Sequence, residues 1–285
     1  MIRARAVQTI FAALVTGLLP AAVAVAAPAP APTDYVALGD SYSSGVGIGV
    51  YRPDSGSCRR SDSAYPALWA ASHTVGSFVF KACSGATTQD VRSGQLAALS
   101  DKIGLVSLTA GGNDAGFSDI LRSCVFPASD ASCDAAVNKG IDYVNRTLPG
   151  RLDGLYRDIK AKAPKAKVVV LGYPRLFERD PCPLSFSLHK RDSLNRGADE
   201  LDRVIAARAQ AAGFTFADPR SRFAGHGICG RDPWINQLDL GDPVESFHPD
   251  KDGHARGYLP TLNAATGRSN QSTDEDSPVN SAAAK

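Results

Sequence analysis

Five short apolar runs are the most regular feature of the chain. Each run is continuous rather than alternating with polar residues, which is typical of parallel strands covered on both faces. Helical patterns lie between them, and the repetition of strand, helix and strand predicts an α/β fold, a three-layer α/β/α sandwich around one parallel sheet. The predicted strands are Tyr35–Leu38, Phe78–Lys81, Leu105–Thr109, Lys167–Leu171 and Thr215–Ala217.

Three longer segments have the apolar spacing of helices. The first follows Ser61 and Asp62, either of which could cap its first turn. The second contains Pro149, so we expect a break or kink near Leu148. The third stops before Gly213, a residue suited to a helix C-terminus. These predicted helices are Ala64–Ser72, Asp134–Lys162 and Leu188–Ala212.

The two ends of the chain differ in composition from the middle. Residues 1–26 combine two arginines, an apolar stretch too short to span a bilayer and a small-residue cleavage site, Ala24-Val25-Ala26. This pattern is typical of a secretory signal peptide and predicts a secreted, extracellular protein. An Ala/Pro leader over 27–33 and a disordered polar tail over 267–285 are expected to flank a single domain at 34–266.

Charge and cysteine content narrow the class of protein further. Without residues 1–26 the chain has 29 Lys and Arg against 29 Asp and Glu, and no basic run that would suit a nucleic-acid partner. We expect a monomer whose contact with lipid interfaces is at most transient. Six cysteines in an exported chain predict disulfides, each stabilising by about 2–4 kcal/mol.

Six cysteines allow 15 pairings, among which the sequence alone does not choose. The short loop between Cys124 and Cys133 makes that pair the simplest. Cys58 and Cys83 flank the first crossover, which would leave Cys182 for Cys229. A metal role is disfavoured because no Cys-x-x-Cys motif occurs.

Unusual residues follow three of the predicted strands: Gly39-Asp40-Ser41, then Cys83-Ser84-Gly85, then Gly111-Gly112-Asn113-Asp114. Ligands of parallel sheets bind beyond the carboxyl ends of the strands, where these segments should meet. Ser41 is either a turn residue or a nucleophile, and a nucleophilic serine needs an adjacent base. The segment does not match the G-x-S-x-G elbow of α/β-hydrolases.

A base must come from one of five histidines, of which His248 has the most restricted backbone. Pro249 holds it extended on a loop before a final helical segment, although a solvated loop histidine is an equally simple interpretation. Asp250 and Asp252 could join His248 and His254 in a metal site, but acids at a helix start are explained by the helix dipole. The remaining histidines are most simply surface residues: His73, His189 and His226.

Acyl transfer also needs rigid N–H donors for the developing oxyanion. The Gly85 backbone and the Asn113 side-chain amide could supply them, although both segments also suit ordinary turns. Trp234, Ile235 and Leu238 precede His248 and either belong to the core or line an acyl pocket.

Taken together, these residues resemble the GDSL esterase/lipase group, also called SGNH hydrolases. The four blocks are Gly39-Asp40-Ser41-Tyr42-Ser43, Gly85, Gly111-Gly112-Asn113-Asp114 and Phe247-His248-Pro249-Asp250, and their order matches the family. The resemblance spans about Tyr35 to Leu262 and is closest to secreted, three-disulfide actinobacterial lipases, esterases and phospholipases. It implies a flavodoxin-like sheet in the order 2-1-3-4-5, no cofactor and no metal.

The resemblance also assigns roles. It implies Ser41 as nucleophile, His248 as general base and then acid, and an oxyanion hole formed by Ser41, Gly85 and Asn113. The pairs Cys58–Cys83, Cys124–Cys133 and Cys182–Cys229 would match the subgroup. The chain departs from the common pattern in having Glu245, where many members have Asp three residues before the histidine. The group that orients His248 is therefore either Glu245 or the main-chain carbonyl of Ser246.

We therefore expect a secreted serine esterase or lipase that acts on carboxylic esters, including lipids or phospholipids. The alternatives are a carbohydrate deacetylase that uses the same residues and a secreted binding domain without turnover. A chromogenic ester assay separates the binding domain from the two enzymes.

Overall fold

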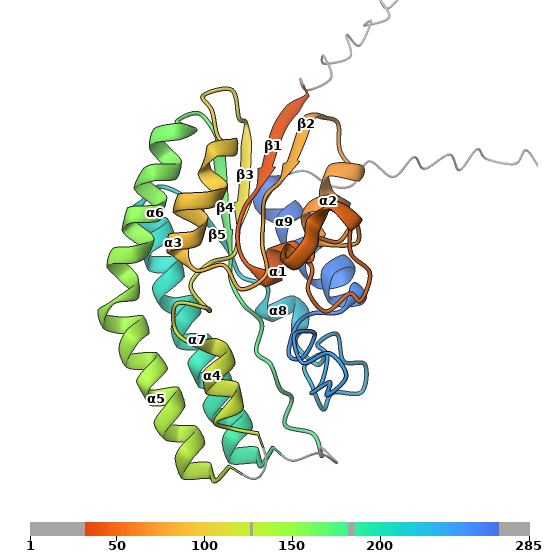
Figure 1. The fold of residues 1–285 in the computed structure, drawn as a ribbon, viewed down its shortest axis with the longest axis vertical. Helices are drawn as coiled ribbons and strands as arrows, with labels where there is room; N and C mark the ends of the chain where they lie inside the picture. The colour runs from red at the N-terminus through yellow and green to blue at the C-terminus, as the bar shows by residue number, and fades with distance from the viewer. Residues whose placement is uncertain (1–31, 126–127, 182–185, 268–285) are drawn as a thin grey trace, which may run out of the picture. The chain divides into compact units, whose positions relative to one another are not determined.

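A computed structural model describes residues 32–125, 128–181 and 186–267 (Figure 1). Five parallel strands form one sheet in the order β2-β1-β3-β4-β5, which confirms the predicted order. Each strand overlaps a predicted one, with ends that shift by a few residues. The strands are β1 (Thr33–Ala37), β2 (Val75–Phe80), β3 (Leu105–Leu108), β4 (Lys167–Leu171) and β5 (Thr215–Ala217).

Helices cover both faces of the sheet, so the predicted three-layer sandwich is confirmed (Figure 1). One layer contains α3 (Thr88–Asp90), α5 (Asp130–Arg146), α6 (Leu148–Lys162) and α7 (Leu188–Ala211). The other contains α2 (Tyr65–Ala71), α8 (Arg220–Phe223) and α9 (Leu259–Thr266). Short helices complete the fold: α1 (Ser41–Ser44), α4 (Phe117–Arg122), two 3₁₀ turns (Pro53–Cys58, Leu96–Ala98) and two π turns (Val91–Gln95, Gly253–Tyr258).

The middle of the sheet is the centre of the core. Val36 of β1, Val106 of β3 and Val169 of β4 have no exposed surface. The edge strand β2 is more open, and its Gly76 and Ser77 are exposed. Burial on both faces therefore holds for the central strands and not for the edge strand β2.

The predicted break near Leu148 is present. α5 ends at Arg146 and α6 begins at Leu148, so Pro149 falls in the first turn of α6, where its missing N–H costs nothing. The predicted cap of α2 is wrong. Ala64 occupies the N-cap position without a side-chain cap, and Ser61 instead accepts the Ser63 N–H at 3.2 Å.

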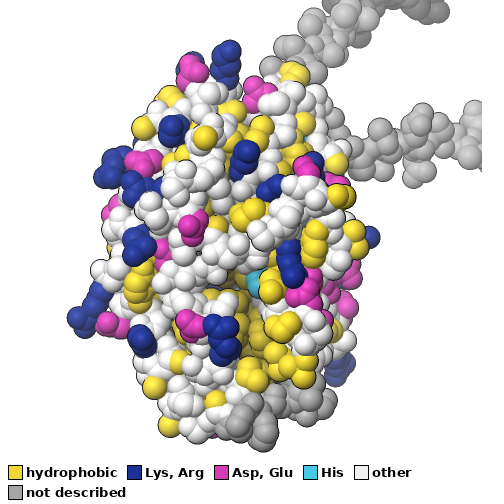
Figure 2. Space-filling view, in the orientation of Figure 1, with side chains coloured by type: hydrophobic (Ala, Val, Ile, Leu, Met, Phe, Trp, Pro, Cys, Tyr) yellow, Lys and Arg dark blue, Asp and Glu magenta, His cyan; other side chains and the backbone are white. Residues whose placement is uncertain are grey.

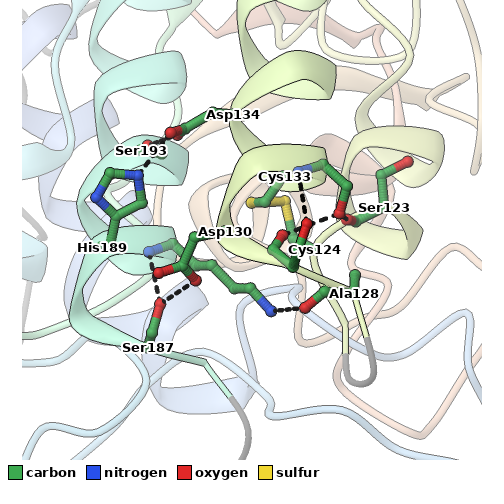
Figure 3. The surroundings of a disulfide bond; sticks show 12 residues. Ser123, Cys124, Ala128, Asp130, Cys133, Asp134, Ser187, His189 and Ser193 are labelled. Atoms are coloured by element: carbon green, nitrogen blue, oxygen red, sulfur yellow. Dashed lines mark hydrogen bonds and ion pairs between the residues drawn. A yellow bond between two sulfur atoms is a disulfide. The ribbon is translucent and has the colours of Figure 1, made fainter.

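Two of the expected disulfides are present, Cys58–Cys83 and Cys124–Cys133. Figure 3 shows the second, close to the start of α5, where Lys190 of α7 donates to the Ala128 carbonyl at 2.5 Å. The third expected pair includes Cys182, which lies outside the described residues.

The predicted signal peptide and all of the predicted tail except Gly267 also lie outside the described residues. Thr33, assigned to the leader from sequence, is the first residue of β1. Across the described residues, no helix combines the length and apolar character needed to cross a bilayer.

Candidate active site

Ser41 begins α1 at the carboxyl end of β1, on a turn that is tightly clamped. Gly39 has φ +120, and a Cβ there would lie 2.5 Å from the Thr109 carbonyl oxygen, so only glycine fits. The Gln95 side chain accepts the Gly39 N–H at 2.8 Å and donates to the Gly39 carbonyl at 2.9 Å. The position of Ser41 is therefore set by the sheet and its immediate neighbours.

Asp40 is the hub of a buried polar network beneath this turn. Its carboxylate accepts the Tyr42 N–H at 3.0 Å, the Thr109 hydroxyl at 2.6 Å and the Tyr173 hydroxyl at 2.5 Å. Burial raises the pKa of Asp40 to about 6, against the opposing effect of these hydrogen bonds. The carboxylate therefore remains mostly ionised at neutral pH and caps the helix that starts at Ser41.

His248 lies directly opposite Ser41. Its Nε2 is 2.7 Å from the Ser41 Oγ, and its Nδ1 is 2.9 Å from the Ser246 carbonyl oxygen. Because a carbonyl only accepts, Nδ1 carries the proton and Nε2 is free to accept from the serine hydroxyl. Burial lowers the pKa of His248 to about 4, which keeps the imidazole neutral at pH 7, the form that a general base requires.

Glu245, the alternative orienting group, has other partners. Its carboxylate accepts from the Tyr51 hydroxyl and lies 3.3 Å from an Arg59 guanidinium nitrogen. Arg59 also pairs with Asp242 at 2.7 Å. The group that the structure places on the far nitrogen of the imidazole is thus the Ser246 carbonyl.

The expected oxyanion donors lie on the loops after β2 and β3. Asn113 lines the same pocket as Ser41, and its side-chain amide donates to the Ala86 carbonyl at 3.0 Å. An amide nitrogen has two N–H groups, so one can hold the side chain in place while the other serves a ligand. Gly85 precedes Ala86 with φ 76, close to the Cys58–Cys83 disulfide.

An apolar pocket extends from Ser41 and Asn113 between α4, α5 and α7. Val137 and Val144 of α5 line it two turns apart, a separation of about 10 Å along the helix. Further walls come from Phe117, Ile120, Ile141, Leu194 and Leu201. In Figure 2 hydrophobic side chains gather around a hollow in which a histidine is visible.

The structure decides the alternatives left open for the segment before His248. Trp234 and Ile235 are buried in the core, whereas Leu238 is 37% exposed. None of the three lines the pocket that contains Ser41.

Two tyrosines in the site, Tyr42 and Tyr173, were given no role in the analysis of the sequence. The Tyr42 hydroxyl donates to the Phe247 carbonyl at 2.7 Å, which links the residue after Ser41 to the residue before His248. Phe247 has φ 62, a left-handed conformation that bulky residues rarely adopt. Tyr173 accepts the Gly112 N–H at 3.3 Å and donates to Asp40. The sole indication in the sequence is that Tyr42 adjoins Ser41.

The other four histidines engage partners elsewhere. His73 stacks on Trp69 at 4.1 Å, His189 pairs with Asp134 at 2.6 Å (Figure 3), and His226 stacks on Trp234 at 3.5 Å. His254 is fully buried, where it accepts the Tyr65 N–H at 3.3 Å, and burial lowers its pKa to about 3. In the part of the chain that is described, no three His, Cys, Asp or Glu side chains gather as metal ligands would.

Comparisons with known proteins identify the family of the chain. Residues 37–256 match the GDSL-like lipase/acylhydrolase family. Lipase 1 of Streptomyces coelicolor is 51% identical over 231 residues, 81% of this chain and 86% of the relative. A lipase of Streptomyces rimosus is 50% identical over 236 residues, 82% of this chain and 87% of the relative.

Solved structures similar to this chain include a member of the same class of enzyme and a more distant protein with the same fold. A phospholipase A1 from Streptomyces albidoflavus is 48% identical, with a TM-score of 0.81 over 82% of this chain and 100% of its own. An acetylxylan esterase from Geobacillus stearothermophilus covers 83% of this chain and 95% of its own with a TM-score of 0.52, but at 18% identity it shows only the shared fold. The chain belongs to the GDSL-like lipase/acylhydrolase family and is a carboxylic ester hydrolase.

Proposed function

We propose that this enzyme hydrolyses esters of extended apolar acyl groups through an acyl-enzyme formed on Ser41. The observation that carries the proposal is the 2.7 Å contact between His248 Nε2 and Ser41 Oγ at one end of an apolar pocket. A serine hydroxyl is a weak nucleophile, and a neutral imidazole at this distance is the base that activates it.

In the first step Ser41 Oγ attacks the ester carbonyl while His248 Nε2 takes the hydroxyl proton. The imidazolium that forms is stabilised by the Ser246 carbonyl, which accepts from Nδ1–H at 2.9 Å. The negative oxygen of the tetrahedral intermediate lies against N–H groups of Ser41, Gly85 and Asn113.

Collapse of the intermediate breaks the bond to the alcohol, which leaves with the proton from His248 Nε2. Water then attacks the acyl-enzyme while His248 again acts as base, and the carboxylic acid is released with Ser41 regenerated. Each proton that His248 accepts is returned within the same half-reaction, so the imidazole is neutral again at the end of each.

The pocket supports acyl chains longer than acetate. An acetyl group would fill only the end near Ser41, whereas the apolar walls continue for about 10 Å along α5. This favours lipid esters over the deacetylase alternative. The names of the similar Streptomyces proteins, lipase and phospholipase A1, support triacylglycerols and phospholipids as substrates.

Two measurements test the proposal. A phosphonate ester inhibitor should label the protein once, at Ser41, and mass spectrometry of its peptides should locate the label. An ester series from short to long acyl chains, with phosphatidylcholine and an acetylated sugar alongside, should favour the longer chains. Label on another serine, or turnover of the acetylated sugar alone, contradicts the proposal.

A blocked pocket sharpens the second measurement. Ala198→Phe places a ring among the pocket walls and should lower activity on long acyl chains more than on acetate. Ala207→Phe, on the exposed side of the same helix, is the matched control. An equal loss on all chain lengths in Ala198→Phe means that the acyl chain binds elsewhere.

We also propose that residues 1–26 direct export. The pattern of these residues, the two disulfides and the similarity to an extracellular Streptomyces rimosus lipase support this. Protein recovered from the medium of a secreting host should begin at Ala27. Retention of the full chain inside the cells contradicts it.

A further inference from the structure

Exposed large hydrophobic side chains are unevenly distributed over the described residues. Four of the five lie in two loops, Gly47–Tyr51 and Asn236–Glu245, which we call the rim loops. Leu240 is 83% exposed and Val50 74%. The other two on the rim loops are Leu238 and Val244, and the fifth is Leu188 at the start of α7. Clustering of this kind marks an interaction surface more often than scattered exposed leucines do.

The two rim loops form one surface. Asn236 of the second loop donates to the Gly47 carbonyl of the first at 2.7 Å, and Tyr51 donates to Glu245. A shallow hollow between them is lined by residues 47–49 and 236–242. The two loops that carry the exposed apolar side chains are therefore joined directly to one another.

The rim adjoins the site of ester cleavage. A Cβ on Gly47 would lie 2.9 Å from the His248 Cβ, so the first loop packs directly against the imidazole residue. The second loop leads within one residue to Ser246, whose carbonyl holds that imidazole. A surface that bound the rim would therefore lie close to His248, the residue that contacts Ser41.

The charges of the rim indicate which kind of surface it suits. The rim loops contain three acids, Asp239, Asp242 and Glu245, and no lysine or arginine, while Arg59 outside the loops pairs with the last two acids. Asp239 is engaged by the backbone N–H of Gly241 at 2.7 Å. The rim thus has apolar side chains among charges that are already partnered, with an acidic balance that disfavours an anionic surface.

We propose that the rim loops are a lipid-contact surface, which seats the enzyme on aggregates of uncharged or zwitterionic lipid with Ser41 facing the ester. The inference rests on the proposed function, because it concerns how that site meets an insoluble substrate. Apolar side chains at the loop tips enter the boundary of the acyl region, while the paired charges remain among the head groups. Transfer of the exposed apolar surface out of water drives the contact.

The test uses phosphatidylcholine vesicles and the Ser41→Ala protein, so that the lipid stays intact. Val50→Ser combined with Leu240→Ser should lower the vesicle partition coefficient about tenfold or more. Leu188→Ser, equally apolar to polar but outside the rim, is the matched control and should bind as the parent does. Leu238→Ser combined with Val244→Ser provides a second rim variant should the first fail to fold.

Activity separates this proposal from the proposed function. With Ser41 restored, each rim variant should hydrolyse dissolved para-nitrophenyl butyrate within about twofold of wild type, yet lose about tenfold on phosphatidylcholine vesicles. No turnover of the dissolved ester by the wild type contradicts the proposed function, whereas vesicle binding by the Ser41→Ala protein is measured independently of it.

Three results overturn the inference. The first is unchanged vesicle binding in both rim variants. The second is stronger binding to phosphatidylglycerol than to phosphatidylcholine, which would assign the contact to charge. The third is a wild-type protein that does not bind vesicles but self-associates through the rim, because a second copy of the chain would then cover these side chains.

Discussion

The turn that carries Ser41 and the loop that carries His248 are held by different kinds of structure. The turn continues a central strand: Asp40 N–H donates to the Thr109 carbonyl at 3.1 Å, and Gln95 clamps Gly39 on both sides. The loop from Asn236 to His248 contains no helix or strand of its own. The nucleophile is therefore positioned by the sheet.

The histidine loop is held instead by individual hydrogen bonds. Asn236 N–H donates to the His248 carbonyl and Phe247 N–H to the Asn236 carbonyl, both at 2.9 Å. Tyr42 then joins this loop to the nucleophile turn through the Phe247 carbonyl. Changes that weaken packing around the turn should therefore lower stability more than activity, whereas loss of a bond that holds the loop should lower both.

The largest expected effect comes from removing the base. His248→Ala should lower turnover on a dissolved ester by at least about 10⁴-fold, because Ser41 loses the group that takes its proton. His226→Ala, which alters a histidine stacked on Trp234 away from the site, is the control and should retain most activity. Substantial turnover by His248→Ala, measured with enzyme free of host esterases, would place the base elsewhere.

Loss of one oxyanion donor should be next in size. Asn113→Ala should lower kcat by roughly 100–1000-fold, because the amide acts on charge that develops only in the transition state. A decrease below about fivefold would mean that Asn113 serves the turn after β3 and not the oxyanion.

Loss of the Tyr42 hydrogen bond, which joins the turn that carries Ser41 to the loop that carries His248, should have an intermediate effect. Tyr42→Phe leaves the buried Phe247 carbonyl without its donor, which should cost about 1–3 kcal/mol of unfolding free energy. We expect kcat to fall about tenfold with KM unchanged, because the Ser41–His248 geometry loosens while the pocket stays intact.

Tyr65→Phe, in α2 beside the turn, is the matched control. It removes a buried hydroxyl that contacts Ser43 at 2.8 Å and has no direct contact with the histidine loop. It should destabilise the protein by a similar amount but leave kcat within about threefold. Equal losses of kcat in both variants would remove the distinction between turn and loop.

The smallest effect should come from Glu245, which supports the rim and not the imidazole. Glu245→Gln should lower turnover less than about tenfold, because the Ser246 carbonyl still holds Nδ1. A loss near 10⁴-fold, the penalty for replacing a triad aspartate, would make Glu245 the third catalytic member.

More of the turn that carries Ser41 than of the loop that carries His248 was predicted from the sequence. Continuous apolar runs located all five strands, and the segments after three of them predicted Ser41, Gly85 and Asn113 as site residues, because parallel strands bring their carboxyl ends to one edge. The order of the strands came from the family resemblance, since local periodicity carries no information on strand neighbours.

The contacts of the loop that carries His248 were not predicted, because they join residues that are far apart in the sequence. Tyr42 and Phe247 are 205 residues apart, and nothing local to either residue indicates their hydrogen bond. Whether Glu245 or the Ser246 carbonyl orients His248 depends on the partners of the Glu245 carboxylate. These partners are Arg59 and Tyr51, which are distant from Glu245 in the sequence. The failed cap of α2 has a local cause instead, since the Ser61 hydroxyl accepts the Ser63 N–H two residues away.

The central claim is that a buried backbone carbonyl, and not a carboxylate, orients a neutral His248 against Ser41. Direct NMR titration of the imidazole in the free enzyme tests it, with His248→Ala used to assign the resonances. A lowered pKa means that the base stays active as pH falls and is lost only on protonation near pH 4. We predict a pKa well below 6.5, with the proton of the neutral ring on Nδ1; a pKa above 6.5, as a carboxylate partner would produce, or a proton on Nε2 would contradict the account.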